Sequence, residues 1–378
     1  MNDLKINAVS TRKDRKAFVD FAWKVYRDDP VWIPPLKAEV HALLNPKKNP
    51  WFGHGRVALF LATRGGQIVG RISAQVDDLV QVHMEPGLGQ WGLFEALDGE
   101  AAAALIAQAE TWLRAEGMTK AIGPISISIW DEPGLLIDGF TQPPMVMMGH
   151  HRPAYRDWIE AAGYTKAKDL YTYELDIRID MVPVIDRLIK AGEKNPRIRI
   201  RKVDKSSFDS EAAIILNLLN DAWSDNWGFV PLTEAEIAYA GTKLSPIIFN
   251  DLVRIAEVDG EPAAFMITIP DVNEMIADLD GRLFPFGWAK LLCRLRSPRT
   301  RRVRVPLMGV TKTLQGSRIA GQLAFMLIEH TRRVCVEKYG VHTGEFGWVL
   351  EDNQGMMSIA KLPGAKINHT YRIFQKTL

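Results

Sequence analysis

The residues from Val303 to Ile328 follow the order of a phosphate-binding element: an apolar strand, a short polar turn, and a helix that begins on small residues. The first N–H groups of a helix have no partner within it, and the helix dipole adds partial positive charge there. Such a turn can hold a pyrophosphate. Arg318 adds a guanidinium that can pair with phosphate oxygens. We therefore predict a pyrophosphate site on the residues of the turn: Gln315, Gly316, Ser317, Arg318, Ile319 and Ala320.

Two carboxylates lie near the strand that follows this helix. Side chains alternate along a strand, so Glu345 and Glu351 share one face of the segment Thr343–Leu350. A carboxylate at a cleft can take the proton from an amine that attacks a carbonyl. Each also has a structural interpretation, because Glu345 can pair with one of many arginines and Glu351 can help to cap the next helix. Both remain candidates for a general base.

The segment 281–304 is basic and rich in aromatic residues. It contains eight Lys or Arg and no Asp or Glu, interleaved with leucine, phenylalanine and tryptophan. Such a composition is typical of a segment that lies on anionic lipid. A helix with an apolar core face and a solvated basic face is the alternative. Nucleic acid is the third candidate partner, but no DNA- or RNA-binding motif accompanies the segment.

The composition excludes several other classes. The 378 residues carry a formal net charge of +2, which implies no polyelectrolyte partner. Two distant cysteines give neither a disulfide framework nor a zinc ribbon, and His150-His151 has no further ligands at a metal spacing, so no metal site is expected. The first residues have no apolar core of a signal peptide, and no apolar run is long enough to span a membrane. We expect a cytoplasmic protein, with peripheral contact to the inner membrane through 281–304 as an open alternative.

The elements needed to position these residues occur twice in the chain. In the first half, a hairpin at 57–75 turns at Gly65-Gly66, and a helix follows at 99–116. In the second half, a hairpin turns at Asp259-Gly260, and the strand, turn and helix of 303–328 follow. The order strand, helix, hairpin, strand, helix, strand, helix, strand predicts a mixed α/β fold in two similar domains. We expect an N-terminal domain at 1–180, a linker helix at 181–196 and a C-terminal domain at 197–378.

The turn and this element order resemble the GNAT acyl-CoA-dependent N-acyltransferases, whose signature is Q/R-x-x-G-x-G/A. Arg318 stands where the central glycine of the signature is expected. The repeat implies two tandem GNAT-like domains, each a mostly antiparallel mixed sheet flanked by helices. The first copy has Asp98-Gly99-Glu100 at its helix entrance, and these acids would repel a pyrophosphate. CoA binding is therefore expected in the second copy only.

Motifs along nearly the whole chain are similar to one bacterial family of tandem GNAT proteins, the YghO-like family that includes bacterial ceramide synthases. They include DPVWIPPL (29–36), WDEPGLLIDGF (130–140) and GEFGWVLEDN (344–353). The resemblance implies transfer of a long acyl chain from acyl-CoA, as co-substrate, to the amine of a sphingoid-like base, with no permanently bound cofactor. A short-chain acetyltransferase and a non-catalytic acyl-CoA- or lipid-binding protein are the alternatives.

The GNAT resemblance also assigns roles to individual residues. A backbone N–H on the central strand, among Met308, Gly309 and Val310, would stabilise the developing oxyanion. Asn353 matches an asparagine that contacts the CoA arm. The tyrosine that protonates the leaving thiolate in many GNAT proteins is replaced by Ala360, and Tyr371 on the last strand is the substitute candidate. Asp131 and Glu132 are candidates to face the active cleft from the first half.

Overall fold

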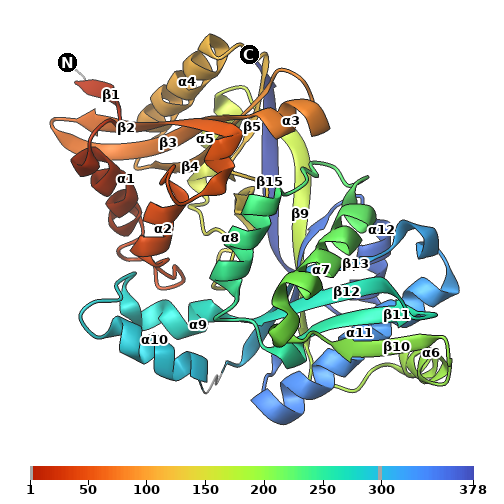
Figure 1. The fold of residues 1–378 in the computed structure, drawn as a ribbon. Coiled ribbons are helices and arrows are strands. Elements are labelled where there is room, and N and C mark those ends of the chain that lie inside the picture. The colour runs from red at the N-terminus through yellow and green to blue at the C-terminus, as the bar shows by residue number, and fades with distance from the viewer. Residues whose placement is uncertain (1–2, 297–299) are drawn as a thin grey trace. The chain divides into compact units, whose positions relative to one another are not determined.

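The computed structural model describes residues 3–296 and 300–378, which form two compact units (Figure 1). Unit 1 consists of Met1–Leu170, Ile276–Leu283 and His369–Leu378, and unit 2 consists of Tyr171–Met275 and Phe284–Asn368. These bounds differ from the predicted domain limits at 180 and 197, because the last strand pairs with strands of the first half. Phe374 lies opposite Gly123 in that pairing.

Unit 1 is a mostly antiparallel sheet with helices packed on it. Its helices and strands are β1 (Leu4–Ala8), α1 (Arg12–Val25), α2 (Lys37–Leu43), η1 (Pro50–Gly53), β2 (Gly55–Arg64), β3 (Gln67–Asp77), α3 (Asp78–His83), β4 (Leu88–Ala96), α4 (Gly99–Ala115), β5 (Lys120–Gly123), β6 (Ile125–Ser126), β7 (Glu132–Pro133), β8 (Leu135–Asp138), α5 (Ala154–Ala161) and η4 (Ala277–Leu279). The unit boundary falls within β9 (Thr165–Asp176) and β15 (Lys366–Thr377). The strand order in unit 1 is β1-β2-β3-β4-β5-β15, and α4 packs on β2, β3 and β4.

The parallel strands β4 and β5 part after a short ladder from Leu88 to Gln90. We call such a place, where two parallel strands stop pairing, a fork. In the unit 1 fork, the chain that leaves β5 folds back against β4. The two backbones approach so closely at Gly92 that a Cβ added there would lie only 2.0 Å from the carbonyl oxygen of Ile125. The N–H of Leu93 donates to Ser126 Oγ at 3.3 Å. The unit 1 fork is therefore filled by its own chain.

Unit 2 has the same organisation. Its helices and strands are α6 (Pro183–Glu193), β10 (Ile198–Lys202), η2 (Lys205–Ser207), α7 (Phe208–Trp223), α8 (Glu234–Leu244), η3 (Asn250–Leu252), β11 (Val253–Val258), β12 (Glu261–Pro270), α9 (Val272–Ile276), α10 (Gly287–Arg296), β13 (Arg302–Val310), η5 (Lys312–Leu314), α11 (Arg318–Tyr339), β14 (Thr343–Leu350) and α12 (Gln354–Lys361). The strand order is β9-β14-β13-β12-β11-β10. Strands β13 and β14 pair in parallel, whereas β10 with β11, β11 with β12 and β12 with β13 pair antiparallel.

The central strand β13 is covered by different helices on its two faces. Met308 packs in a cluster with Leu323 and Leu327 of α11. Gly309 faces α7, since a Cβ there would meet Ala222 at 2.8 Å. Successive strand side chains point to opposite faces, so α11 and α7 lie on opposite sides of β13. Figure 1 shows α7 and α11 flanking the strands β11 to β13.

The central strands of both units carry a β-bulge. In unit 2, Ile267 lies opposite Leu307 and Ile269 opposite Arg304, so β13 has one extra residue at Val305–Pro306. In unit 1, β4 has one extra residue at the corresponding step, between Gly92 and Glu95. Bulges bend a strand and end its regular pairing. Together with the repeated element order, this confirms the predicted mixed α/β fold in two similar units.

Candidate active site

The unit 2 fork is open. The ladder between β13 and β14 runs from Arg302 opposite Thr343 to Val305 opposite Phe346, and then both strands continue without pairing. A pocket lies at this point, with about 440 Å³ of space that protein atoms do not fill, its open side included. Pro306 of the bulge has no N–H to donate, so the ladder is interrupted where the pocket begins. The residues that line the pocket are Trp223, Asn226, Val305, Pro306, Met308, Phe346, Gly347, Trp348, Val349, Leu350, Asn353 and Met356.

The backbone groups of β13 divide between its two edges. The N–H of Thr311 donates to the carbonyl oxygen of Ala263 on β12. The carbonyl oxygen of Met308 instead accepts from Trp223 Nε1 at 3.0 Å, and that of Val310 accepts from Gln315 Nε2 at 2.9 Å. Because the N–H and C=O of one residue in a strand point to the same side, the N–H groups of Met308 and Val310 also point away from β12. Gly309 then directs its N–H toward β12.

The predicted pyrophosphate turn is formed as a helix entrance. Gly316 has a φ of 74°, a conformation that favours glycine, and a Cβ there would meet no atom within 4 Å. Ser317 is the N-cap of α11, with its Oγ accepting from the N–H of Ala320 at 3.2 Å. The Gln315 side chain donates to the carbonyl oxygen of Val310 and so holds the turn against the end of β13. Ile319 packs against the hydrophobic core of unit 2. The turn therefore offers the N–H groups of its first helical residues to a ligand.

Arg318 is the cation that this entrance presents. It is the first residue of α11 and is exposed, and it makes no ion pair with any residue in the described ranges 3–296 and 300–378. Lys312, close to the same turn, is already paired with Asp225 at 2.7 Å. No acid lies in the first turn of α11. The charge of the entrance is therefore positive.

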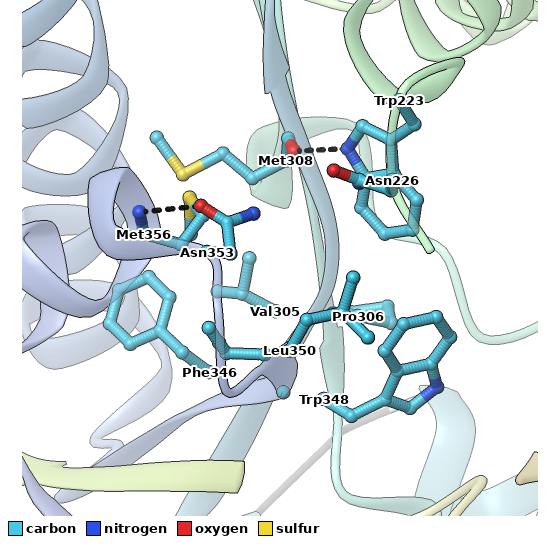
Figure 2. A pocket seen from close by; sticks show the side chains of 12 residues that line it. Trp223, Asn226, Val305, Pro306, Met308, Phe346, Trp348, Leu350, Asn353 and Met356 are labelled. Atoms are coloured by element: carbon cyan, nitrogen blue, oxygen red, sulfur yellow. Dashed lines mark hydrogen bonds between the residues drawn. The ribbon is translucent and has the colours of Figure 1, made fainter. Parts of the chain in front are cut away.

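Asn353 lies at the start of α12, on the side of the pocket opposite Trp223 and Trp348 (Figure 2). Its Oδ1 accepts from the N–H of Met356 at 3.0 Å and caps the helix. Figure 2 shows the amide nitrogen of Asn353 turned away from this contact, toward the middle of the pocket. The cap uses only the acceptor, so the Nδ2 donors face the space between β13 and α12.

The two candidate bases have different surroundings. Glu345 is fully buried, accepts from Asn368 Nδ2 at 2.8 Å and lies 3.8 Å from the Nε of the buried Arg304. Glu351 is half-buried, next to Leu350 and two residues before Asn353. Neither is among the residues that line the pocket, although the neighbours of Glu351 are. The fold thus gives Glu345 a partner in the core and leaves Glu351 at the pocket rim.

Tyr371 belongs to unit 1, where it is buried and its hydroxyl donates to the carbonyl oxygen of Gly149 at 3.0 Å. Tyr371 is not among the residues that line the pocket of unit 2. Its proposed acid role stays a prediction.

The other polar residues singled out in the first half form contacts within unit 1. Asp131 accepts from Ser128 Oγ, and His150 Nε2 lies 2.8 Å from a carboxylate oxygen of Asp29. His151 Nδ1 accepts from a backbone N–H, and burial lowers the pKa of this histidine to about 3. Glu132 is accessible to solvent, yet the surrounding protein raises the pKa of its carboxyl to about 7. Among the described residues, no group of three or more His, Cys, Asp or Glu is placed to hold a metal ion.

Sequence reasoning missed one side of the pocket. Trp223 and Asn226 come from the end of α7 and the loop after it, far from β13 in the sequence. Trp348 lies within the family-like motif GEFGWVLEDN (344–353), but nothing in the spacing of that motif indicates a pocket. An unusually aromatic helix end is the one local signal that these positions offer.

Two curated proteins are similar to the chain over almost its full length. One is the bacterial ceramide synthase of Caulobacter vibrioides, 43% identical over 378 residues, covering 100% of this chain and 98% of that protein. The other is protein YghO of Escherichia coli, 41% identical over 370 residues, covering 97% of this chain and 94% of that protein. The chain belongs to this family of tandem GNAT-fold acyltransferases. The predicted enzyme class, an acyl-CoA-dependent N-acyltransferase, is thereby confirmed at the level of the family.

Solved structures agree with the fold. A tandem GNAT protein from the clavulanic acid biosynthesis pathway aligns with a TM-score of 0.58 at 13% identity, covering 99% of this chain and 98% of that chain. A GCN5-related N-acetyltransferase from Sphaerobacter thermophilus aligns with a TM-score of 0.53 at 12% identity, covering 99% and 95%. No protein-family model matches the chain.

The basic segment 281–304 contains α10, and its residues 297–299 lie outside the described ranges. None of the α10 residues is buried. Phe284, Phe286 and Trp288 are 81%, 74% and 50% exposed, and the Lys290 and Arg296 side chains are exposed on the same short segment. In the part of the chain that the structure describes, no helix has the length and apolar character needed to span a membrane.

Proposed function

We propose that this enzyme transfers a long-chain acyl group from acyl-CoA to the amine of a sphingoid-like lipid base. The open fork of unit 2, beside a helix entrance that has an arginine and no acid, carries the proposal. The pantetheine arm would lie in the fork, and its pyrophosphate would contact the N–H groups of Arg318 and Ile319 and the Arg318 side chain. The name of the Caulobacter relative, ceramide synthase, supports a lipid-like acceptor.

The chemistry proposed for this site is direct attack in a ternary complex. The amine nitrogen attacks the thioester carbonyl carbon, and the oxygen takes negative charge that the N–H of Met308 or Val310 stabilises. The tetrahedral intermediate then collapses, the C–S bond breaks and CoA leaves as a thiolate, and the second proton of the attacking nitrogen passes to that thiolate or to solvent, which leaves a neutral amide. A thiol pKa of about 8.5 makes that thiolate a tolerable leaving group near neutral pH, so an acid such as Tyr371 assists without being essential.

The amine must lose a proton before it attacks. An amine with a pKa of about 10 is mostly ammonium at pH 7, and forming the free base costs about 4 kcal/mol. We propose that Glu351 accepts this proton, because its neighbours Leu350 and Asn353 line the pocket. We assign Glu345 a supporting role, since its contacts with Arg304 and Asn368 neutralise a charge in the core.

A membrane surface is the proposed source of the lipid acceptor. The exposed aromatic residues of 284–288 would insert into the headgroup region, and nearby basic residues would pair with anionic lipid. Sedimentation with liposomes tests this proposal. We expect the wild type to bind phosphatidylglycerol vesicles at low salt, and the variants Phe284→Ser/Phe286→Ser and Lys290→Gln/Arg296→Gln to bind them more weakly. Equal binding of all three proteins, or no binding of the wild type, would refute the membrane role.

The substrate proposal is tested by thiol release from palmitoyl-CoA and acetyl-CoA, each with and without a sphingoid base. We expect release that depends on the base and is fastest with palmitoyl-CoA, with an N-acyl product identified by mass spectrometry. Turnover with acetyl-CoA and a small amine alone would favour a short-chain acetyltransferase. Binding of acyl-CoA without turnover would favour a non-catalytic binding protein.

A further inference from the structure

One side of the unit 2 pocket is built from two tryptophans. Trp223 ends α7 and Trp348 lies in β14, with ring centroids 6.0 Å apart and ring planes at 57°. Figure 2 shows both indoles on the side of the pocket opposite Asn353 and Met356. Both side chains are only half-buried, so their faces remain available to an apolar ligand.

The position of the tryptophans relative to the CoA-binding groups indicates what they contact. The helix entrances that present N–H groups and Asn353 belong to α11 and α12, whereas α7 lies on the other face of β13. An arm that starts at the α11 entrance and passes through the fork therefore emerges on the α7 side. The group attached to the sulfur then meets Trp223 and Trp348.

Trp223 is held in place by the strand that carries the proposed oxyanion donor. Its indole Nε1 donates to the carbonyl oxygen of Met308 at 3.0 Å. This bond fixes the ring against β13 and also satisfies a carbonyl that would otherwise face the thioester oxygen. Trp348 makes ring contact with Trp223 and no side-chain hydrogen bond to any residue in the described ranges, so its contribution is apolar surface.

We propose that Trp223 and Trp348 form the wall on which the first methylenes of the acyl chain pack, and that this wall selects long-chain acyl-CoA over acetyl-CoA. The inference rests on the proposed function of the pocket as the acyl-CoA site. Each buried methylene favours the longer donor about fourfold, so a few methylenes on the wall give a large preference. Acetyl-CoA has no methylene to place there.

The experiment compares kcat/KM for acetyl-, octanoyl- and palmitoyl-CoA across variants. Trp348→Ala is expected to lower the palmitoyl-to-acetyl ratio by about tenfold or more, while Trp348→Phe keeps most of the ratio. Trp223→Phe keeps the ring but loses the bond to Met308, so it should lower kcat for all donors and preserve the ratio. Trp227→Ala, a tryptophan of the same unit outside the pocket lining, is the matched control, and melting temperatures verify folding.

The outcomes separate this inference from the proposed function. A wild-type enzyme inactive with every acyl-CoA would refute the function itself. An active wild type whose donor ratio is unchanged in Trp348→Ala, or whose rates with all donors fall equally, would refute the wall and leave the acyltransferase function standing.

Discussion

The two units contain the same fork and use it differently. In each, a bulged central strand runs parallel to the strand after its helix, and the pair parts after a short ladder. In unit 1 the chain after β5 occupies the gap, and Ser126 takes the N–H of Leu93. In unit 2 the gap is a pocket beside Met308. A fork that is filled has no room for a pantetheine arm.

The helix entrances beside the two forks differ in charge. The entrance of α4 is capped by Asp98 and has Glu100 in its first turn, and both acids are held by Arg64 at 2.6 and 2.8 Å. The entrance of α11 is capped by Ser317, and Arg318 is its first residue. Both caps satisfy the helix equally well, so the difference is one of ligand chemistry rather than of helix stability. Both units keep the same architecture, but in the described residues the open fork and the positive helix entrance that the proposed acyl-CoA site needs are those of unit 2.

The largest expected effect comes from removing a carboxylate at the open fork. Glu351→Gln should lower kcat by about a hundredfold, because the amine then has no positioned proton acceptor. Glu132→Gln, the matched change in unit 1, should leave kcat within about twofold. The measurement is the initial rate with palmitoyl-CoA and a sphingoid base. A larger loss in Glu132→Gln than in Glu351→Gln would reverse the roles assigned to the two units.

The next effect comes from giving α11 the charge of α4. Ser317→Asp/Arg318→Glu keeps a good N-cap, so the helix should fold, but the new acids repel the pyrophosphate. We expect the KM for palmitoyl-CoA to rise on the order of tenfold to a hundredfold. The reciprocal variant in unit 1, Asp98→Ser/Glu100→Arg, should leave that KM unchanged. A KM that responds to the unit 1 variant instead would contradict the comparison.

Arg318 alone should have a smaller effect. Arg318→Ala removes one exposed charged contact and should raise the KM for acyl-CoA about fivefold, with Arg318→Lys in between. The value of kcat should change little, since the phosphate contact is the same in the ground and transition states. An unchanged KM would leave phosphate binding to the backbone N–H groups alone.

The smallest effect concerns unit 1 and its stability. Glu132 has a folded-state pKa of about 7, above the usual value, because the surrounding protein desolvates part of its accessible carboxyl and Asp131 repels its charge. Between about pH 4.5 and pH 7, the folded state therefore keeps a proton on Glu132 that the unfolded state has lost. The free energy of unfolding falls as pH rises through that window. The melting temperature of Glu132→Gln minus that of the wild type should therefore increase from pH 5 to pH 8. A difference that stays constant with pH would show that Glu132 is not perturbed.

The sequence predicted the repeat because its signals are local. Glycine turns at Gly65-Gly66 and Asp259-Gly260 fix hairpins, and the strand Thr343–Leu350 was placed at its observed bounds. The charge contrast between the two helix entrances was also visible, since caps and first turns are contiguous in the chain.

The remaining features depend on contacts between distant residues. The partner of Glu345 is Arg304, forty-one positions earlier, and alternation along one strand gives no information about that pairing. The pocket wall joins Trp223 to Trp348 across the fork. The last strand pairs with β5 of the first half, a non-local ladder that no sequence pattern specified.

The most direct test of the account is to locate the bound acyl-CoA. A photoreactive palmitoyl-CoA analogue, crosslinked to the full chain and mapped by mass spectrometry, reports which fork holds it, and calorimetry gives the stoichiometry. The account predicts one molecule per chain, with crosslinks on peptides from 305–310, 346–353 and the Trp223 region. Crosslinks on 88–96 and 120–127 of unit 1, or two molecules bound per chain, would contradict it.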